Sequence, residues 1–261
     1  MNQHWHWQTC CDRAYLTCNL LSNWQHGFFT QEFYPRTPED LTLDLKSNTT
    51  AYRVKQVHGN LVLTPKEIAK IVDADHTIQL AEADAVISDR PQQSVWVASA
   101  DCTPVLIGDL VTGQVCAIHA GWRGTAQKIV PQAIARFFNS GSQIKNLRVA
   151  IGPAISGKMY QVDESVALKV CQTIAGDPSL EPETAIAQLK KLANPPILDD
   201  EALGKVRLDV PRVNKIQLEQ LGLHSEQIAI APCCTFQDSD RFFSYRRTGE
   251  KKVQWSGIVS Q

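Results

Sequence analysis

The sequence lacks the features that would place it among membrane or nucleic-acid-binding proteins. It contains no run of about 18 apolar residues, so we expect no membrane-spanning helix and no membrane partner. Its 26 Lys and Arg residues balance 27 Asp and Glu residues, which leaves a formal net charge of −1. Without excess positive charge the chain has no strong attraction to phosphate backbones, so we expect no nucleic-acid partner. Internal repeats are also missing, which excludes a solenoid.

Signs of secretion are missing as well. The first residues contain no basic segment followed by an apolar one, so we expect no secretory signal and a cytoplasmic location. Eight cysteines are spread over 261 residues, whereas small secreted domains concentrate their cysteines in short chains. We therefore expect free thiols in a reducing compartment. Most of them should pack as small apolar residues, as Cys116 does in Val115-Cys116-Ala117-Ile118.

Short apolar runs and helical stripes predict an α/β fold, in a length that suits one large domain or two small ones. Strands are predicted where apolar runs end at Asp, Pro, Gly or Thr, at residues 84–88, 95–100, 105–108, 115–119, 147–151 and 228–231. Helices are predicted where apolar residues recur at helical spacing, at residues 125–139, 163–175 and 208–221. Because several strands follow each other without a helix between them, we expect one α/β domain with antiparallel or mixed pairing.

Two stretches are irregular. Thr125 is a possible N-cap of the helix over 125–139, but Pro131 is an awkward residue for the interior of that helix. Residues 177–207 contain four prolines and mixed charge. This composition predicts a long surface insertion, with a short helix near 185–192.

The two ends of the chain receive different interpretations. Residues 1–25 are assigned to a variable N-terminal segment, in which we expect His4-Trp5-His6 to be disordered or at the surface. The main domain is assigned to residues 26–261. Near its end, the segment Phe242-Phe243-Ser244-Tyr245-Arg246-Arg247 has the aromatic and basic residues typical of a strand end.

Three short segments place polar, metal-competent side chains beside predicted strands or glycine turns, where open α/β sheets hold ligands. They are Lys55-Gln56-Val57-His58-Gly59-Asn60, Ala100-Asp101-Cys102-Thr103-Pro104 and His119-Ala120-Gly121-Trp122-Arg123-Gly124-Thr125. His58, Cys102 and His119 are too far apart in sequence for a local zinc finger, so the fold must bring them together. One interpretation is a zinc ion with three protein ligands and one open position. A nucleophilic pair of Cys102 and His119 is another, and ordinary structural roles are a third.

The third segment also contains groups suited to an anion. Gly121 and Gly124 allow the backbone to approach a ligand closely and leave N–H groups free at a helix start. Arg123 supplies a permanent cation for a phosphate or carboxylate.

Five segments occur in a characteristic order: Val57-His58-Gly59, Ala100-Asp101-Cys102, His119-Ala120-Gly121-Trp122-Arg123-Gly124, Ile151-Gly152-Pro153 and Phe242-Phe243-Ser244-Tyr245-Arg246-Arg247. In these motifs the chain resembles the YfiH/laccase-domain family, also known as polyphenol oxidase-like or purine nucleoside phosphorylase proteins. The resemblance covers residues 26–259, and its most specific part is His-Ala-Gly-Trp-Arg-Gly. It implies a single-domain α/β/β/α sandwich with mixed sheets, and a Zn²⁺ ion held by His58, Cys102 and His119. It also implies phosphorolysis of adenosine, inosine, guanosine or methylthioadenosine, together with deamination of adenosine.

The chain departs from the family pattern in two places. Gly27-Phe28-Phe29-Thr30 is followed by Gln31-Glu32-Phe33, where the family has an Arg and a Gly-Gly turn. Between Thr37 and Tyr52 there is no room for the helix with an Asn-Arg pair that usually precedes the first His motif. Substrate or phosphate contacts from this region are therefore not expected to follow the family.

In the phosphorolysis that the resemblance implies, phosphate attacks C1′ of the ribose while the purine leaves through an oxocarbenium-like transition state. Arg123, the N–H groups near Gly124, and Arg247 are candidates to hold the phosphate charge. Asp101 is a candidate proton donor to the leaving base. Since it neighbours Cys102, it could instead point away and be structural. Tyr245 is a candidate substrate contact.

Other functions predict different chemistry at the same residues. A copper polyphenol oxidase needs repeated His-x-His pairs, whereas this chain has one, at residues 4–6. Copper chemistry is therefore not expected, although Cu²⁺ has the affinity to replace Zn²⁺ adventitiously. A cysteine hydrolase using Cys102 and His119, and a non-catalytic nucleoside-binding protein, are the two alternatives.

Overall fold

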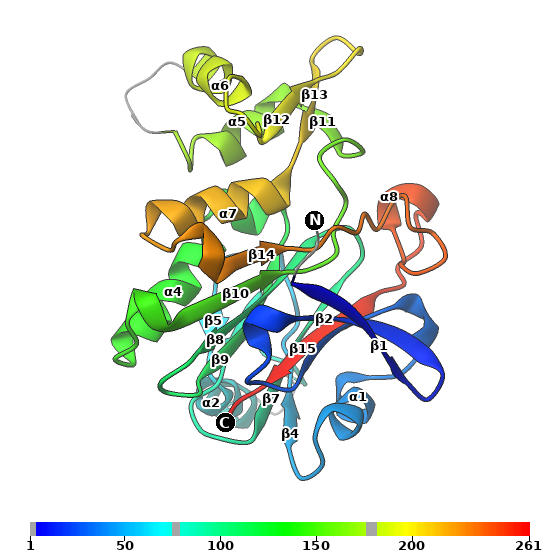
Figure 1. The fold of residues 1–261 in the computed structure, drawn as a ribbon, viewed down its shortest axis with the longest axis vertical. Coiled ribbons are helices and arrows are strands. Elements are labelled where there is room, and N and C mark those ends of the chain that lie inside the picture. Colours follow the sequence, from blue (N-terminus) through cyan, green and yellow to red (C-terminus); the bar gives the residue numbers. More distant parts are fainter. Residues whose placement is uncertain (1–3, 75–78, 176–181) are drawn as a thin grey trace.

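The computed structural model describes residues 4–74, 79–175 and 182–261, and two six-stranded sheets form its centre (Figure 1). In spatial order, the first sheet contains β1 (Trp5–Cys10), β2 (Arg13–Cys18), β3 (His26–Phe29), β15 (Gln254–Val259), β7 (Gln93–Ser99) and β4 (Thr50–Tyr52). The second contains β14 (Ile228–Ile230), β10 (Leu147–Ile151), β8 (Thr103–Asp109), β9 (Val115–Ala120), β6 (Ala85–Ile87) and β5 (Val62–Leu63). The pairs β4–β7, β5–β6 and β10–β14 are parallel and the others are antiparallel, which confirms the expected mixed pairing.

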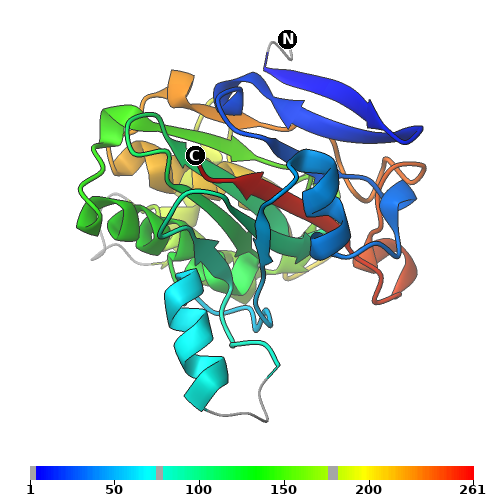
Figure 2. The same cartoon turned by 90° about the horizontal axis from the view of Figure 1, so that it is seen from below.

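Helices cover the outer faces of both sheets (Figures 1 and 2). α1 (Pro38–Leu45) packs on the first sheet through Leu41, which contacts Trp96 and its neighbours. α4 (Ile129–Asn139) and α7 (Val210–Gln220) pack on the second sheet. This arrangement confirms the α/β/β/α sandwich. The other helices are α2 (Pro65–Ala74), α3 (Trp122–Ala126), α5 (Glu164–Cys171), α6 (Pro182–Lys190) and α8 (Tyr245–Thr248).

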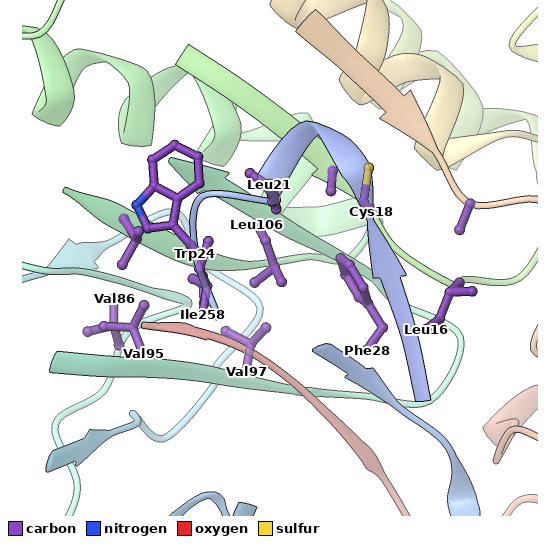
Figure 3. Close-up of a cluster of buried hydrophobic side chains, with 14 of the residues drawn as sticks. Leu16, Cys18, Leu21, Trp24, Phe28, Val86, Val95, Val97, Leu106 and Ile258 are labelled. Carbon is purple, nitrogen blue, oxygen red and sulfur yellow. The ribbon is translucent and has the colours of Figure 1, made fainter. Parts of the chain in front are cut away.

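Strand alternation builds the core, because successive side chains on a strand point to opposite faces. On β8, Leu106 joins the cluster between the two sheets, while Val105 and Ile107 face α4. On β7, Val95 and Val97 enter the same inner cluster, which Figure 3 shows together with Trp24 and Phe28. Both faces of these strands are apolar because helices or a second sheet cover each of them.

The helix predicted over 125–139 is two helices, α3 and α4. Lys128 separates them with a left-handed backbone (φ 59°). Pro131 therefore lies in the first turn of α4, where its missing N–H costs no helical hydrogen bond. The N-cap prediction for Thr125 was wrong, since Thr125 lies inside α3, fully buried.

Two further expectations need correction. Of the predicted insertion, residues 177–181 lie outside the described residues. The remainder is not a plain surface loop, because β13 (Lys205–Leu208) pairs with both β12 (Ile197–Asp199) and β11 (Gln161–Asp163) and lies between them in a third sheet. Helices α5 and α6 pack on this sheet around an apolar cluster that includes the fully buried Ile197. The expected short helix is confirmed as α6, which begins three residues earlier than predicted.

The expectation that His4-Trp5-His6 is disordered or at the surface was wrong for Trp5. This residue lies in β1 and is only 8% exposed, and its ring centre is 5.4 Å from that of Phe28. Between Thr37 and Tyr52 there is room for a helix, α1, which begins with a capping box of Thr37 and Asp40. No helix in the described part of the chain is long and apolar enough to cross a membrane.

Candidate functional site

The structure brings His58, Cys102 and His119 together. Their metal-binding atoms all lie within 4.8 Å of one another, and the two imidazole rings stand nearly perpendicular at 82°. His119 is on β9 and Cys102 directly precedes β8, and these two strands are paired with Pro104 opposite His119. His58 comes from the loop between β4 and β5 and has a left-handed backbone (φ 60°). Strand pairing therefore positions two of the three residues, and a loop positions the third.

Glycines allow α3 to pack tightly against this cluster. A Cβ atom at Gly121 would lie 2.8 Å from the Cys102 Sγ, and one at Gly124 would lie 2.8 Å from the backbone oxygen of Gly59. Both distances are too short for any side chain. The glycines of the His-Ala-Gly-Trp-Arg-Gly motif are thus required by close packing around Cys102 and the His58 loop.

Asp84 holds two parts of the cluster, and the sequence reasoning missed it. Its fully buried carboxylate accepts hydrogen bonds from the backbone N–H groups of Val57, His58 and Gly59, at 3.2, 2.9 and 2.6 Å. It also lies 2.8 Å from Nδ1 of His119. This contact orients the ring and leaves Nε2 as the ligand nitrogen, as carboxylate partners do in zinc sites. The available signal was an Asp directly before a buried strand, which was interpreted only as a strand boundary.

The same contacts control protonation. Burial raises the pKa of Cys102, but hydrogen bonding to His119 and His58 outweighs burial and brings the pKa to about 6. Burial lowers the pKa of His119, but the hydrogen bonds to Asp84 and Cys102 outweigh it and raise the pKa to about 9. At neutral pH Cys102 is therefore a thiolate, which is the form that binds metals. His119 carries a proton in the metal-free protein at this pH, and a bound ion would displace it. Two imidazoles and a thiolate within reach of one point then fit a zinc ion.

Arg123 lies in α3, two residues after Gly121, which packs against Cys102. Its guanidinium stacks on the Trp122 ring at 4.5 Å and its side chain is exposed. Within the described residues no carboxylate forms an ion pair with it. An exposed guanidinium without a protein anion is suited to bind an external one.

A small, mainly apolar cavity opens next to Cys102. Trp122, Ile155, Tyr160 and Val210 are the large apolar and aromatic residues of its wall. Burial and the nearby Cys102 charge raise the pKa of Tyr160 to about 12, so its phenol stays protonated at neutral pH.

Asp101 has both carboxylate oxygens engaged. Oδ1 accepts a hydrogen bond from the Thr235 hydroxyl at 2.7 Å, and Oδ2 accepts one from the backbone N–H of Arg246 at 2.7 Å. Its left-handed backbone (φ 88°) forms the turn that leads to Cys102. These contacts favour the structural alternative for Asp101, in which it ties this turn to the C-terminal motif.

Tyr245, Arg246 and Arg247 of the C-terminal motif lie in the short helix α8, and the three motif residues before them lie in no strand, so the prediction of a strand end was wrong. Arg247 donates three hydrogen bonds to the backbone oxygens of Thr235, Phe236 and Phe242, and these contacts favour a structural role. Tyr245 is 56% exposed. A second arginine beside the cavity wall is Arg246, whose guanidinium lies 4.9 Å from the Tyr160 ring centre. The sequence reasoning did not select Arg246.

Comparison with known proteins identifies a family model and curated relatives that match most of the chain. The family model described as multi-copper polyphenol oxidoreductase laccase matches residues 37–260. A purine nucleoside phosphorylase of Synechocystis sp. is 54% identical over 98% of this chain and 97% of its own length. One of Bacteroides thetaiotaomicron is 30% identical over 85% of this chain and 74% of its own.

Two solved structures share the fold. They are Bacillus licheniformis hypothetical protein YfiH, with a TM-score of 0.73, 24% identity and coverage of 95% of this chain and 96% of that one, and Geobacillus stearothermophilus YlmD, with a TM-score of 0.74, 22% identity and coverage of 98% of both. The matched length and the identity to the Synechocystis protein decide the assignment. The chain belongs to the YfiH/laccase-domain family.

Proposed function

We propose that this protein is a zinc-dependent purine nucleoside phosphorylase. The observation that carries the proposal is the convergence of His58, Cys102 and His119 against α3, the helix that carries Arg123. The purine nucleoside phosphorylase name of the 54% identical relative supports the reaction class. His58, Cys102 and His119 would hold the ion, and bound Zn²⁺ supplies a Lewis acid that stabilises negative charge near the reacting atoms.

The reaction joins phosphate to the sugar and releases the base. A phosphate oxygen forms a bond to C1′ while the glycosidic bond breaks, and the bonding electrons leave with the purine. The purine then takes a proton, which gives the free base and ribose 1-phosphate. Arg123 is proposed to bind the phosphate through charge-assisted hydrogen bonds, with help from the backbone near Gly124.

The base is proposed to lie over the rim of the cavity, because the cavity volume of about 30 Å³ is too small to enclose a purine. Trp122 and Tyr160 provide aromatic faces for a purine, and the protonated Tyr160 hydroxyl is the donor available to the departing base. Asp101 is proposed to position the Cys102 turn, because both of its oxygens already accept hydrogen bonds. Tyr245, on the exposed side of α8, is proposed as an outer contact for the sugar.

The substrate range rests on the family resemblance alone. We propose that adenosine, inosine, guanosine and methylthioadenosine are cleaved, and that adenosine is also deaminated to inosine. Copper oxidase chemistry is not proposed, because it needs repeated histidine pairs. Among the described residues, one group of three potential ligands contains only two histidines, and the other group, Cys10, Cys11 and Asp44, contains none.

A cysteine hydrolase remains a second candidate, because the lowered pKa of Cys102 beside His119 also suits a nucleophilic thiolate. One experiment separates the two. Purified protein is analysed for zinc and incubated with adenosine, with and without phosphate, before and after treatment with a chelator. We expect adenine only when phosphate is present, and loss of activity on chelation that added Zn²⁺ reverses. Turnover that survives complete zinc removal but not thiol alkylation would overturn the zinc proposal.

A further inference from the structure

A second group of metal-competent side chains lies at the tip of the β1–β2 hairpin. Cys10, Cys11 and Asp44 place their ligand atoms within 4.8 Å of one another. None of them belongs to the candidate active site. Cys10 ends β1, Cys11 is in the turn, and Asp44 comes from the last turn of α1.

The turn geometry puts two adjacent thiols on the same side. Neighbours on a strand normally point to opposite faces. Here Cys11 and Asp12 have left-handed backbones, with φ of 50° and 60°, and the two sulfur atoms lie only 3.8 Å apart. The other pair of adjacent cysteines, Cys233 and Cys234, differs in its surroundings. Cys234 is buried, and its sulfur accepts a hydrogen bond from the backbone N–H of Ser156.

The sulfur–sulfur distance matches that of a tetrahedral thiolate site. With Zn–S bonds of about 2.3 Å and a tetrahedral angle, two thiolates on one zinc ion lie about 3.8 Å apart. Cys10 and Cys11 therefore need little movement to chelate a single ion. In contrast, a disulfide would require the sulfur atoms to approach to about 2.05 Å.

The surrounding charges suit a divalent cation. Asp44 supplies a carboxylate that is already held in place by an ion pair with Arg36. Two thiolates and the Asp44 carboxylate carry three negative charges, and Arg36 with a divalent ion carries three positive ones. The occupied site would thus be neutral, which limits the cost of holding charge at a partly buried position.

We propose that Cys10, Cys11 and Asp44 form a binding site for one thiophilic divalent ion of the zinc type. Binding forms two metal–sulfur bonds and one metal–oxygen bond, and it releases the two thiol protons to solvent. The remaining coordination position is open to water. This site is independent of the proposed phosphorylase function.

Cadmium titration tests the site, because cadmium–thiolate bonds absorb in the near ultraviolet. The full chain carries Cys102→Ala, so that the candidate active site contributes no thiolate signal. We expect saturation at one Cd²⁺ per chain, complete loss of the signal in Cys10→Ser/Cys11→Ser, and affinity lowered by at least about tenfold in Asp44→Asn. The control Cys233→Ser removes a thiol from the other adjacent pair and should leave the titration unchanged.

Three results would overturn the proposal. The first is an undiminished signal in Cys10→Ser/Cys11→Ser, and the second is saturation at one Cd²⁺ per two chains, which would indicate bridging between molecules. The single variant Cys11→Ser changes only an exposed turn residue, so circular dichroism should show an intact fold. A thiolate signal of full intensity in that variant would also contradict chelation by the pair.

Discussion

The two metal-competent groups differ in how the fold supports them. The first group is His58, Cys102 and His119, and the second is Cys10, Cys11 and Asp44. His119 is buried, and Asp84 holds both its ring and the backbone of the His58 loop. Around Cys10 and Cys11, one hairpin turn and one ion pair of Asp44 provide the support, and Cys11 is exposed. A buried carboxylate with four hydrogen bonds fixes ligand direction far better than an exposed turn. The comparison therefore predicts tight binding and chemistry at the first group, and weaker, exchangeable binding at the second.

Removing the central thiolate should break the first group completely. We expect Cys102→Ala to lose both zinc and turnover, because two imidazoles alone bind the ion too weakly to keep it through purification. Metal analysis and phosphorolysis of adenosine measure the two effects. Cys116→Ala, which removes a thiol buried in the core, serves as a control and should retain zinc. Normal zinc content in Cys102→Ala would refute the assignment of the three ligands.

Asp84→Asn tests whether the buried carboxylate is what distinguishes the first group. We expect zinc affinity to fall by about 10- to 100-fold, since the amide cannot accept all of the same hydrogen bonds or stabilise the orientation of His119. Competition with a chromophoric chelator measures the affinity. The control is Asp109→Asn, which alters another fully buried aspartate that accepts backbone hydrogen bonds away from the site. Equal losses of affinity in both variants would mean that general destabilisation is the cause.

Arg123→Ala probes the anion-binding side of the first group. We expect KM for phosphate to rise about tenfold, in line with loss of a charge-assisted hydrogen bond, while zinc content stays unchanged. Arg241→Ala is a matched control, because Arg241 also stacks on a tryptophan, Trp7, at 4.0 Å. The role of Arg123 would be rejected if the two variants showed the same KM for phosphate.

The pH dependence of thiol alkylation gives the smallest and most selective effect. In metal-free protein the Cys102 thiol should become reactive as the pH rises through about 6, because His119 and His58 stabilise its thiolate. Burial raises the pKa of Cys233 to about 11, so it should stay unreactive at pH 7.5. Mass spectrometry after brief iodoacetamide treatment measures both sites. Added Zn²⁺ should protect Cys102, and a midpoint near 9 would show that the two histidines do not stabilise the thiolate.

Six of the fifteen described strands, β6 to β10 and β14, and the metal-competent residues could be predicted because their signals are local. Apolar runs such as Val105-Leu106-Ile107 predicted β8, and the motifs around His58, Cys102 and His119 predicted the group that the structure assembles. Predictions failed where distant contacts decide the outcome. The split between α3 and α4 follows Gln127, whose backbone oxygen accepts a hydrogen bond from Asn60 of the His58 loop. The last three residues of the motif at 242–247 lie in α8, where the backbone N–H of Arg246 donates to Asp101.

The sequence by itself determined the α/β class, the apolar strands and the residue types able to bind a metal, because each depends on neighbours in the chain. Only the tertiary structure decided the role of Asp84, which contacts residues 25 and more positions away. The same holds for the thiols of Cys10 and Cys11, whose alignment with Asp44 depends on the packing of α1 near the hairpin. Hydrogen bonds and ligand distances between remote segments follow from packing, and no local pattern of residues specifies them.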